Sequence, residues 1–94
     1  MAECVIFEDR NFDGAAYQTF GDIRSLKNVP KGMGGLGNWS DETSSIRIMS
    51  GTWRFFEHVD FGGQSWVLGP GDYPWVPDQG IPDNSISSIQ KISD

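Results

Sequence analysis

The chain has little cysteine, histidine or basic charge, and each shortage excludes a class of function. Cys4 is the single cysteine among 94 residues, which excludes an intrachain disulfide and a cysteine-rich zinc site. Seven basic residues against thirteen acidic ones give a net charge of −6. This balance argues against binding to the phosphate backbone of nucleic acids, and it suits a divalent cation as partner.

Long apolar runs are also absent. No apolar segment approaches the roughly 20 residues of a membrane-spanning helix, so we expect no membrane-embedded part. The first residues, Met1 to Cys4, lack the basic region of a signal peptide. The location therefore stays open between the cytoplasm and a domain excised from a secreted protein. A hydrophobic content of 37 % is enough for one small core, so we expect one domain over 1–94, as a monomer.

Catalytic residue types are scarce as well. His58 is the only histidine, and nothing in the sequence pairs it with a nucleophile and an orienting group. Cys4 stands in an apolar run and is interpreted as a buried or edge residue rather than an activated thiolate. We therefore expect a protein that is not an enzyme.

Glycine and strand-forming residues, by contrast, are plentiful. Twelve glycines and five prolines separate short runs rich in β-branched and aromatic residues. The runs are 4–7, 16–20, 45–49, 53–56, 64–68 and 86–92. Only 22–27 has the pattern of a helical turn, with Asp22 as N-cap. Several short strands at this spacing predict an all-β sandwich or Greek-key arrangement.

One pattern occurs twice, at 7–14 and at 56–63. Each copy has a phenylalanine, a glutamate, three variable residues, a second phenylalanine and a glycine two positions further on. We expect Gly14 and Gly63 to adopt positive φ and the two phenylalanines of each copy to pack together. Each copy is followed by a hydroxyl-rich hexamer, at 40–45 and at 83–88. Such a repeat indicates two units, about 1–50 and 51–94, that bury one core together.

These two elements, in this order, resemble the βγ-crystallin family over nearly the whole chain, and 69–73 resembles the hairpin before that family's third strand. The resemblance implies two interlocked Greek-key motifs that form a wedge of two four-stranded sheets. Each motif would lend a strand to the sheet of the other. It further implies a single domain of the calcium-binding type found in microbes and invertebrates.

The hexamers are the candidate sites. In the calcium-binding branch of the family the hexamer reads Asn/Asp-Asn/Asp-x-x-Ser/Thr-Ser, which 83–88 fits at every position. The resemblance implies that calcium is bound by the side chain of the second residue, the carbonyl of the third and the hydroxyl of the fifth. A further carbonyl comes from the residue after the first aromatic. Carried over, these ligands are Glu57, Asn84, Ser85 and Ser87 for one repeat and Glu8, Asp41, Glu42 and Ser44 for the other.

The two repeats are implied to exchange ligands, so that each of two calcium ions contacts both. Calcium prefers several oxygen ligands in a flexible shell, which agrees with these residue types. The first hexamer departs from the pattern at Ser40, which forms the local turn bond more weakly than Asn or Asp. We therefore expect two sites of different affinity, and a fold that calcium stabilises.

Two other features need an interpretation. The segment 32–37 spells a dinucleotide-binding fingerprint, but no helix start follows it, so we predict a loop. Four tryptophans keep an alternative open, a recognition module such as a protease inhibitor, a toxin-like module or a carbohydrate binder. We expect Trp53 and Trp66 to pack in the core and Trp39 and Trp75 to be exposed.

Overall fold

The computed structural model describes residues 1–30 and 37–94, so the loop predicted at 32–37 lies almost wholly outside the described residues. The described residues form seven strands: β1 (Glu3–Asp9), β2 (Asp13–Thr19), β3 (Ser45–Ser50), β4 (Thr52–His58), β5 (Gly62–Leu68), β6 (Gly71–Tyr73) and β7 (Ser88–Ser93). They also form three short 3₁₀ segments: η1 (Arg10–Phe12), η2 (Leu26–Asn28) and η3 (Val76–Gln79). In this part of the chain, no helix is long and apolar enough to cross a membrane.

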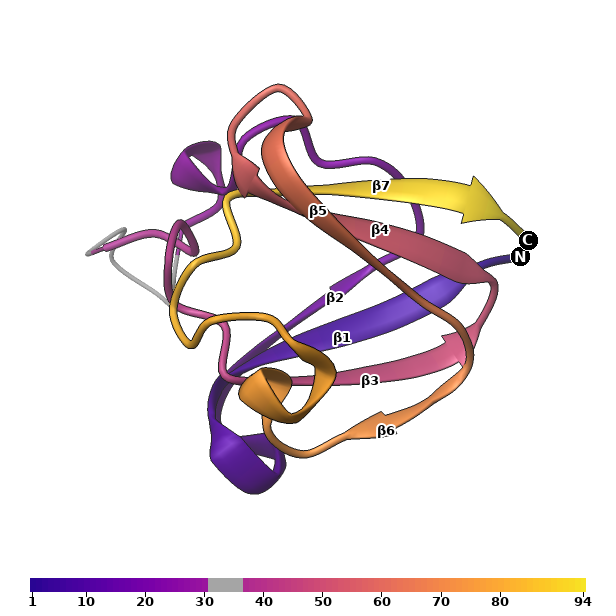
Figure 1. The fold of residues 1–94 in the computed structure, drawn as a ribbon, viewed down its shortest axis with the longest axis horizontal. Helices are drawn as coiled ribbons and strands as arrows, with labels where there is room; N and C mark the ends of the chain where they lie inside the picture. Colours follow the sequence, from indigo (N-terminus) through magenta and orange to yellow (C-terminus); the bar gives the residue numbers. More distant parts are fainter. Residues whose placement is uncertain (31–36) are drawn as a thin grey trace.

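The strands form two antiparallel sheets, one in the order β2-β1-β3-β6 and the other in the order β5-β4-β7 (Figure 1). Strand β6 comes from the second half of the chain but pairs with β3 of the first half. In return, Ile23 of the first half bridges Ile89 of β7, with backbone hydrogen bonds of 2.8 and 2.9 Å. Each half therefore contributes to the other half's sheet, which confirms the prediction of two interlocked Greek keys.

The second sheet is smaller than expected. The described residues give it three strands and the single bridge at Ile23, where a fourth strand was predicted. Next to this bridge, the carboxylate of Asp22 accepts a hydrogen bond from the backbone amide of Lys91 at 2.7 Å. The Asp22 side chain thus accepts the hydrogen bond that the backbone of a fourth strand would otherwise accept from Lys91. The helical turn predicted over 22–27 is also wrong in its start, because η2 begins only at Leu26.

The repeated phenylalanine-glycine pattern forms two equivalent folded hairpins. Gly14 has φ +77° and Gly63 has φ +74°, and a Cβ there would lie within 2.6 Å of Asp9 Oδ2 or 2.5 Å of His58 Cδ2. The rings of Phe7 and Phe12 lie 5.4 Å apart between centroids, as do those of Phe56 and Phe61. Both expectations from the sequence are confirmed.

The core lies between the sheets and takes alternate residues of the central strands, among them Ile6 of β1 and Phe55 of β4. Cys4 is buried there, and burial raises the pKa of its thiol to about 12. Such a thiol stays protonated, in agreement with the interpretation of an unactivated cysteine.

The tryptophans differ in part from expectation. Trp53 is fully buried and Trp66 packs against the core, as predicted. Trp39 was expected to be exposed, but it is only 1 % exposed. Its backbone amide donates to the carbonyls of Leu26 and Val29, both at 3.1 Å, so Trp39 is bonded directly to the buried residue Leu26. Trp75 is half-buried rather than exposed.

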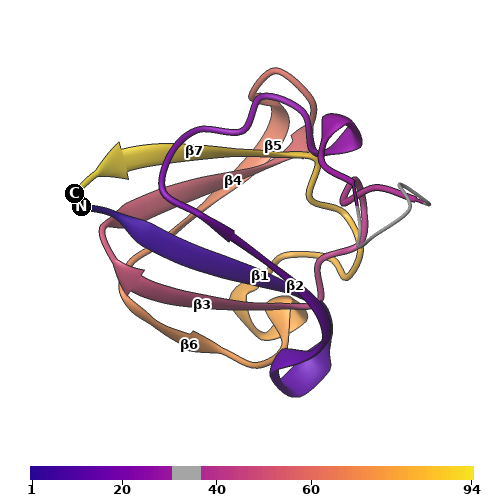
Figure 2. The same ribbon diagram turned by 180° about the vertical axis from the view of Figure 1, so that it is seen from behind.

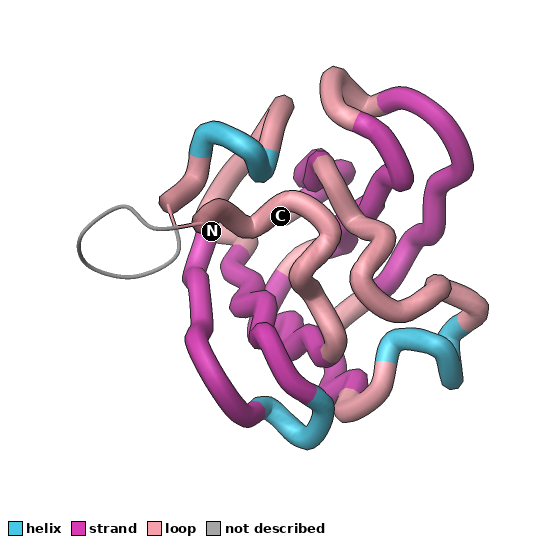
Figure 3. The backbone as a smooth tube through the Cα atoms, turned by 90° about the vertical axis from the view of Figure 1, so that its left-hand side faces the viewer, coloured by secondary structure: helices cyan, strands magenta, loops and turns pink. Residues whose placement is uncertain are grey.

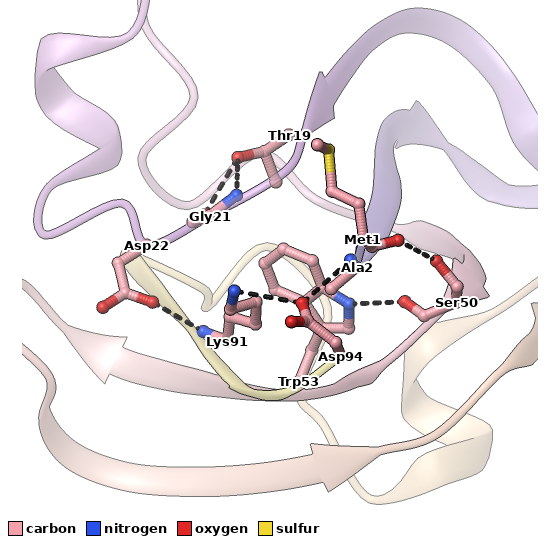
Figure 4. A network of polar contacts seen from close by, with 9 residues as sticks. All are labelled: Met1, Ala2, Thr19, Gly21, Asp22, Ser50, Trp53, Lys91 and Asp94. Atoms are coloured by element: carbon pink, nitrogen blue, oxygen red, sulfur yellow. Dashed lines mark hydrogen bonds and ion pairs between the residues drawn. The ribbon is translucent and has the colours of Figure 1, made fainter.

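The two chain ends lie side by side, at the end of the molecule opposite the hexamers (Figures 1 and 2). The backbone amide of Ala2 donates to a carboxylate oxygen of Asp94 at 3.1 Å, and the same oxygen accepts a bond from the Lys91 ammonium at 3.1 Å (Figure 4). The Lys91 hydrogen bond lowers the pKa of Asp94 below its ordinary value.

At the end of the molecule away from the chain termini, loop segments lie in front of the strands (Figure 3).

Candidate metal sites

The two hexamers lie against each other through backbone hydrogen bonds. The amide of Asp41 donates to the carbonyl of Ile86 at 2.9 Å, and the amide of Asn84 donates to the carbonyl of Thr43 at 3.3 Å. The second residue of each hexamer is therefore bound to the fourth residue of the other. This reciprocal pairing relates the two halves by an approximate twofold symmetry.

Each hexamer is also bound to its own repeated hairpin. The amide of Ser44 donates to the carbonyl of Phe7 and the amide of Ser87 to the carbonyl of Phe56, both at 2.9 Å. These bonds place each fifth-position serine beside the residue after the first aromatic, which is Glu8 or Glu57. The sequence resemblance named the same two elements as ligand sources.

The hydroxyls of the two fifth-position serines reach across to the opposite hexamer. The Ser87 hydroxyl donates to Oδ1 of Asp41 at 3.1 Å and lies 3.2 Å from the Ser40 hydroxyl. The Ser44 hydroxyl donates to Oδ1 of Asp83 at 2.6 Å and to Oδ1 of Asn84 at 3.3 Å. Both serines are only 5 % exposed. Each serine thus faces the first and second residues of the other repeat.

Two cavities open at these crossing points, and each is named here after its serine. The Ser87 cavity is lined by Lys27, Ser40, Asp41, Glu57, His58, Val59, Asn84, Ser85 and Ser87. The Ser44 cavity is lined by Glu8, Asp9, Arg10, Glu42, Ser44, Trp75, Asp83 and Asn84.

Each of the eight candidate ligands lines at least one of the two cavities. Three residues of each repeat stay together: Glu57, Ser85 and Ser87 in one cavity, and Glu8, Glu42 and Ser44 in the other. Asp41 lines the Ser87 cavity, away from the rest of its own repeat. Asn84 lines both cavities. The structure therefore brings the candidates together in the exchanged arrangement, with residues of both repeats around each cavity.

The second residue of each hexamer has an unusual backbone. Asp41 has φ +60° and Asn84 has φ +59°, both in the left-handed region. Asn and Asp tolerate this conformation better than other side chains that carry a Cβ, because their short polar groups bond locally. The pattern's preference for these two residues at position two thus has a conformational reason in addition to their oxygen atoms.

The sixth-position serines tie the hexamers to the hairpins. The hydroxyl of Ser45 donates to the carbonyl of Asp9 at 2.6 Å and accepts from the amide of Phe12 at 3.0 Å. Ser88 makes the equivalent bonds to the carbonyl of His58, at 2.6 Å, and the amide of Phe61, at 3.1 Å. Both serines are fully buried. They satisfy backbone groups of the strained hairpin turns and hold each cavity's wall in place.

The two cavities differ in charge. Among the described residues, the Ser44 cavity is lined by four carboxylates and one guanidinium, those of Glu8, Asp9, Glu42, Asp83 and Arg10. The described residues that line the Ser87 cavity include two carboxylates, one lysine and His58. His58 is exposed, with Nε2 at 3.4 Å from Oε1 of Glu57. The Ser44 cavity is thus the more acidic.

Sequence reasoning missed several lining residues. Of the first residues of the hexamers, Ser40 was given only a turn bond and Asp83 no ligand role, yet each hydrogen-bonds the opposite serine. The hexamer pattern itself could have indicated them. Arg10 and Trp75 come together from distant parts of the chain, with Cζ of Arg10 at 4.5 Å from the Trp75 ring centroid. The sequence carries no local signal for that contact.

Within residues 1–30 and 37–94, no group of three or more His, Cys, Asp or Glu side chains lies close enough to hold a metal ion. The described lining residues offer carboxylate, hydroxyl and amide oxygens around both cavities, which are donor types that hard cations bind.

Comparison with known proteins identifies the family. The family model described as Beta/Gamma crystallin matches residues 3–92. A βγ-crystallin from Ciona intestinalis is 31 % identical over 97 % of this chain and 99 % of its own length. A solved structure of a βγ-crystallin from Ciona intestinalis, 31 % identical over 95 % of this chain and 98 % of its own, superposes with a TM-score of 0.82. The solved structure of an archaeal βγ-crystallin is 42 % identical over 97 % of this chain and 98 % of its own, also with a TM-score of 0.82.

Other relatives differ in length or in what they bind. The structure of a transition-metal-ion-binding βγ-crystallin from Methanosaeta thermophila is 26 % identical over 95 % of this chain and 99 % of its own, with a TM-score of 0.73. Some structural relatives thus bind metal ions. The chain spans about a third of the length of the mouse gamma-crystallin N that it matches at 33 % identity over 73 % of its own residues. With its crossed Greek keys, paired hairpins and this match over nearly its full length, the chain belongs to the beta/gamma-crystallin family.

Proposed function

We propose that the protein is a non-enzymatic module that binds two calcium ions, one in each cavity, and is stabilised by them. The observation that carries this proposal is the crossed contact of each fifth-position serine with the second residue of the other hexamer, Ser87 with Asp41 and Ser44 with Asn84. Because of this crossing, an ion in either cavity contacts both halves of the fold.

The donor chemistry supports calcium as the ion. The proposed donors in the Ser87 cavity are the Asp41 carboxylate, the Ser87 hydroxyl and the backbone carbonyls of Glu57 and Ser85, all from residues that line it. The matching donors in the Ser44 cavity are the Asn84 amide, the Ser44 hydroxyl and the backbone carbonyls of Glu8 and Glu42. Carboxylate, amide, hydroxyl and carbonyl oxygens are what calcium takes in proteins, with waters completing the shell. Transition metals favour imidazole and thiolate donors, and among the described lining residues His58 is the one side chain of this kind.

The expected role of the ions is to stabilise an already folded protein. The core between the sheets is built largely from aromatic and aliphatic side chains of the strands, such as Ile6, Trp53 and Phe55, so we expect the metal-free protein to fold. An ion that binds only the assembled hexamers adds RT ln(1 + [Ca]/Kd), about 2.7 kcal/mol at a hundredfold excess over Kd.

Thermal unfolding tests this proposal. We expect the midpoint in millimolar calcium to exceed the midpoint in EDTA, while magnesium at the same concentration has a smaller effect because it demands a tighter octahedral shell. The recognition-module alternative predicts equal midpoints with and without calcium. The recognition-module alternative has one exposed tryptophan fewer for binding a partner, because Trp39 is buried. Equal midpoints together with binding to a glycan or protease panel would favour it over calcium binding.

A further inference from the structure

Arg10 is held at the rim of the Ser44 cavity by a distant part of the chain. It begins η1, and its guanidinium lies over the Trp75 ring, with Cζ at 4.5 Å from the centroid. Both residues line the cavity. The two segments are joined by a backbone hydrogen bond of 2.8 Å from Asn11 to Pro74, and η1 lies beside η3 in both ribbon views (Figures 1 and 2). The charge therefore has a fixed place.

The Ser87 cavity has a positively charged residue of its own, Lys27, but no arginine is among its described lining residues. Three positions after the first aromatic of its hairpin, the chain has Val59 where the first repeat has Arg10. The counterpart of Trp75 is Ser25, because Leu26 and Val76 make matching backbone bonds to Ser87 and Ser44, at 2.8 and 3.0 Å. Neither Val59 nor Ser25 is charged. An arginine held on an aromatic ring is thus one of the differences in charge between the two cavities.

The charge of Arg10 affects the Ser44 cavity differently with and without a bound metal ion. Four carboxylates line the Ser44 cavity, and Arg10 is the one positively charged residue among its described lining residues. Without a metal ion, a nearby positive charge lowers the repulsion among these carboxylates. When calcium enters, the same charge repels it.

We propose that Arg10, held in place by Trp75, is the residue that sets the calcium affinity of the Ser44 cavity: it acts as a counter-charge in the metal-free state and opposes calcium binding there. This inference rests on the proposed function. It assigns an affinity-determining role to a residue outside the hexamers, and it acts on one cavity only.

Arg10→Gln tests it first. We expect calcium to bind the Ser44 cavity about tenfold more tightly, as the removal of one nearby positive charge requires, while the Ser87 cavity changes less than about twofold. The two cavities are distinguished by following the backbone amide signals of Ser44 and Ser87 in an NMR titration with calcium.

Two further variants separate position from net charge. Trp75→Leu keeps the charge of Arg10 but removes the ring that holds it, so we expect a smaller gain, about threefold, at the Ser44 amide. Arg24→Gln is the matched control. Arg24 also lies against an aromatic ring, with Cζ at 6.0 Å from the Phe61 centroid, but it lines neither cavity. We expect it to leave the Ser44 amide's titration unchanged.

The counter-charge also has a readout that needs no calcium. In EDTA at low salt, Arg10→Gln is expected to melt at a lower temperature than the wild-type protein, and added sodium chloride should reduce this gap because salt screens the carboxylates. A gap that salt leaves unchanged would mean that Arg10 acts only by packing on Trp75, which overturns the proposal.

The remaining outcomes are equally decisive. An unchanged calcium affinity of the Ser44 cavity in Arg10→Gln, or an equal gain in Arg24→Gln, overturns the role of Arg10 while leaving two-site binding intact. If the wild-type protein binds no calcium at all, the proposed function fails. In that case the salt-dependent melting of Arg10→Gln still decides whether Arg10 is a counter-charge.

Discussion

Ser87 and Asp41 are 46 positions apart in the chain, and the Ser87 hydroxyl donates a hydrogen bond to the Asp41 carboxylate at 3.1 Å. The pseudo-symmetric contact, from Ser44 to Asn84, measures 3.3 Å. The candidate ligands of one repeat are therefore positioned by the other repeat. Neither half contains a whole candidate site, so a site of this kind would report on the assembly of both halves.

The first prediction concerns Ser87→Arg. This change removes a hydroxyl and places a fixed positive charge beside Asp41, so we expect the ion of the Ser87 cavity to be lost. The other ion should bind more weakly, since Asn84 lines both cavities. Calorimetry measures the stoichiometry, and circular dichroism in EDTA checks that the variant folds.

Matched variants complete this test. Ser44→Arg should remove the other ion by the same mechanism. Ser65→Arg adds the same charge at an exposed position of β5 outside both hexamers, and we expect it to keep two ions. Wild-type affinity for two ions in Ser87→Arg would show that the ligand assignment is wrong.

The second prediction separates the two roles of Asn84, its backbone conformation and its amide oxygen. Asn84→Val should destabilise the metal-free protein by about 1–2 kcal/mol, because a β-branched residue resists φ +59°. Asn84→Gly should keep metal-free stability, since glycine adopts this conformation freely, but should weaken calcium binding. Denaturant unfolding in EDTA and a calcium titration measure the two effects. Equal stability of the two variants would contradict the conformational role.

The third prediction concerns the Cys4 thiol. Its pKa is raised by burial from 9.0 to about 12, so the unfolded chain loses this proton at a lower pH than the folded one does. The stability that this thiol contributes is therefore fully present below about pH 9 and is lost as the pH rises toward 12. Cys4→Ala should show a shallower loss of stability across that range in urea unfolding. Equal pH profiles for the two proteins would count against the buried, protonated thiol.

Much of the fold could be predicted from local features of the sequence. Positive φ at Gly14 and Gly63, and the packing of Phe7 on Phe12, follow from a pattern contained within eight residues. The burial of Trp39 could not be predicted in this way. It depends on backbone bonds to Leu26 and Val29, which lie 10 or more positions earlier in the chain.

The candidate site could likewise be predicted only in part from the sequence. The hexamer pattern placed Asp41 and Ser87 among the ligands, and the resemblance implied that the repeats exchange them. The missing fourth strand at Ile23 and the contact of Arg10 with Trp75 had no counterpart in the sequence pattern. Both depend on which segments the interlocked topology brings together, and periodicity within a segment carries no information on that.

The most direct test of two-site calcium binding is isothermal titration calorimetry of the metal-free protein with calcium. We predict a stoichiometry of two with unequal affinities, because the Ser87 cavity has the Asp41 carboxylate where the Ser44 cavity has the neutral Asn84 amide, and the lining charges differ. A stoichiometry of zero or one, or two identical affinities, would contradict this account of the paired cavities.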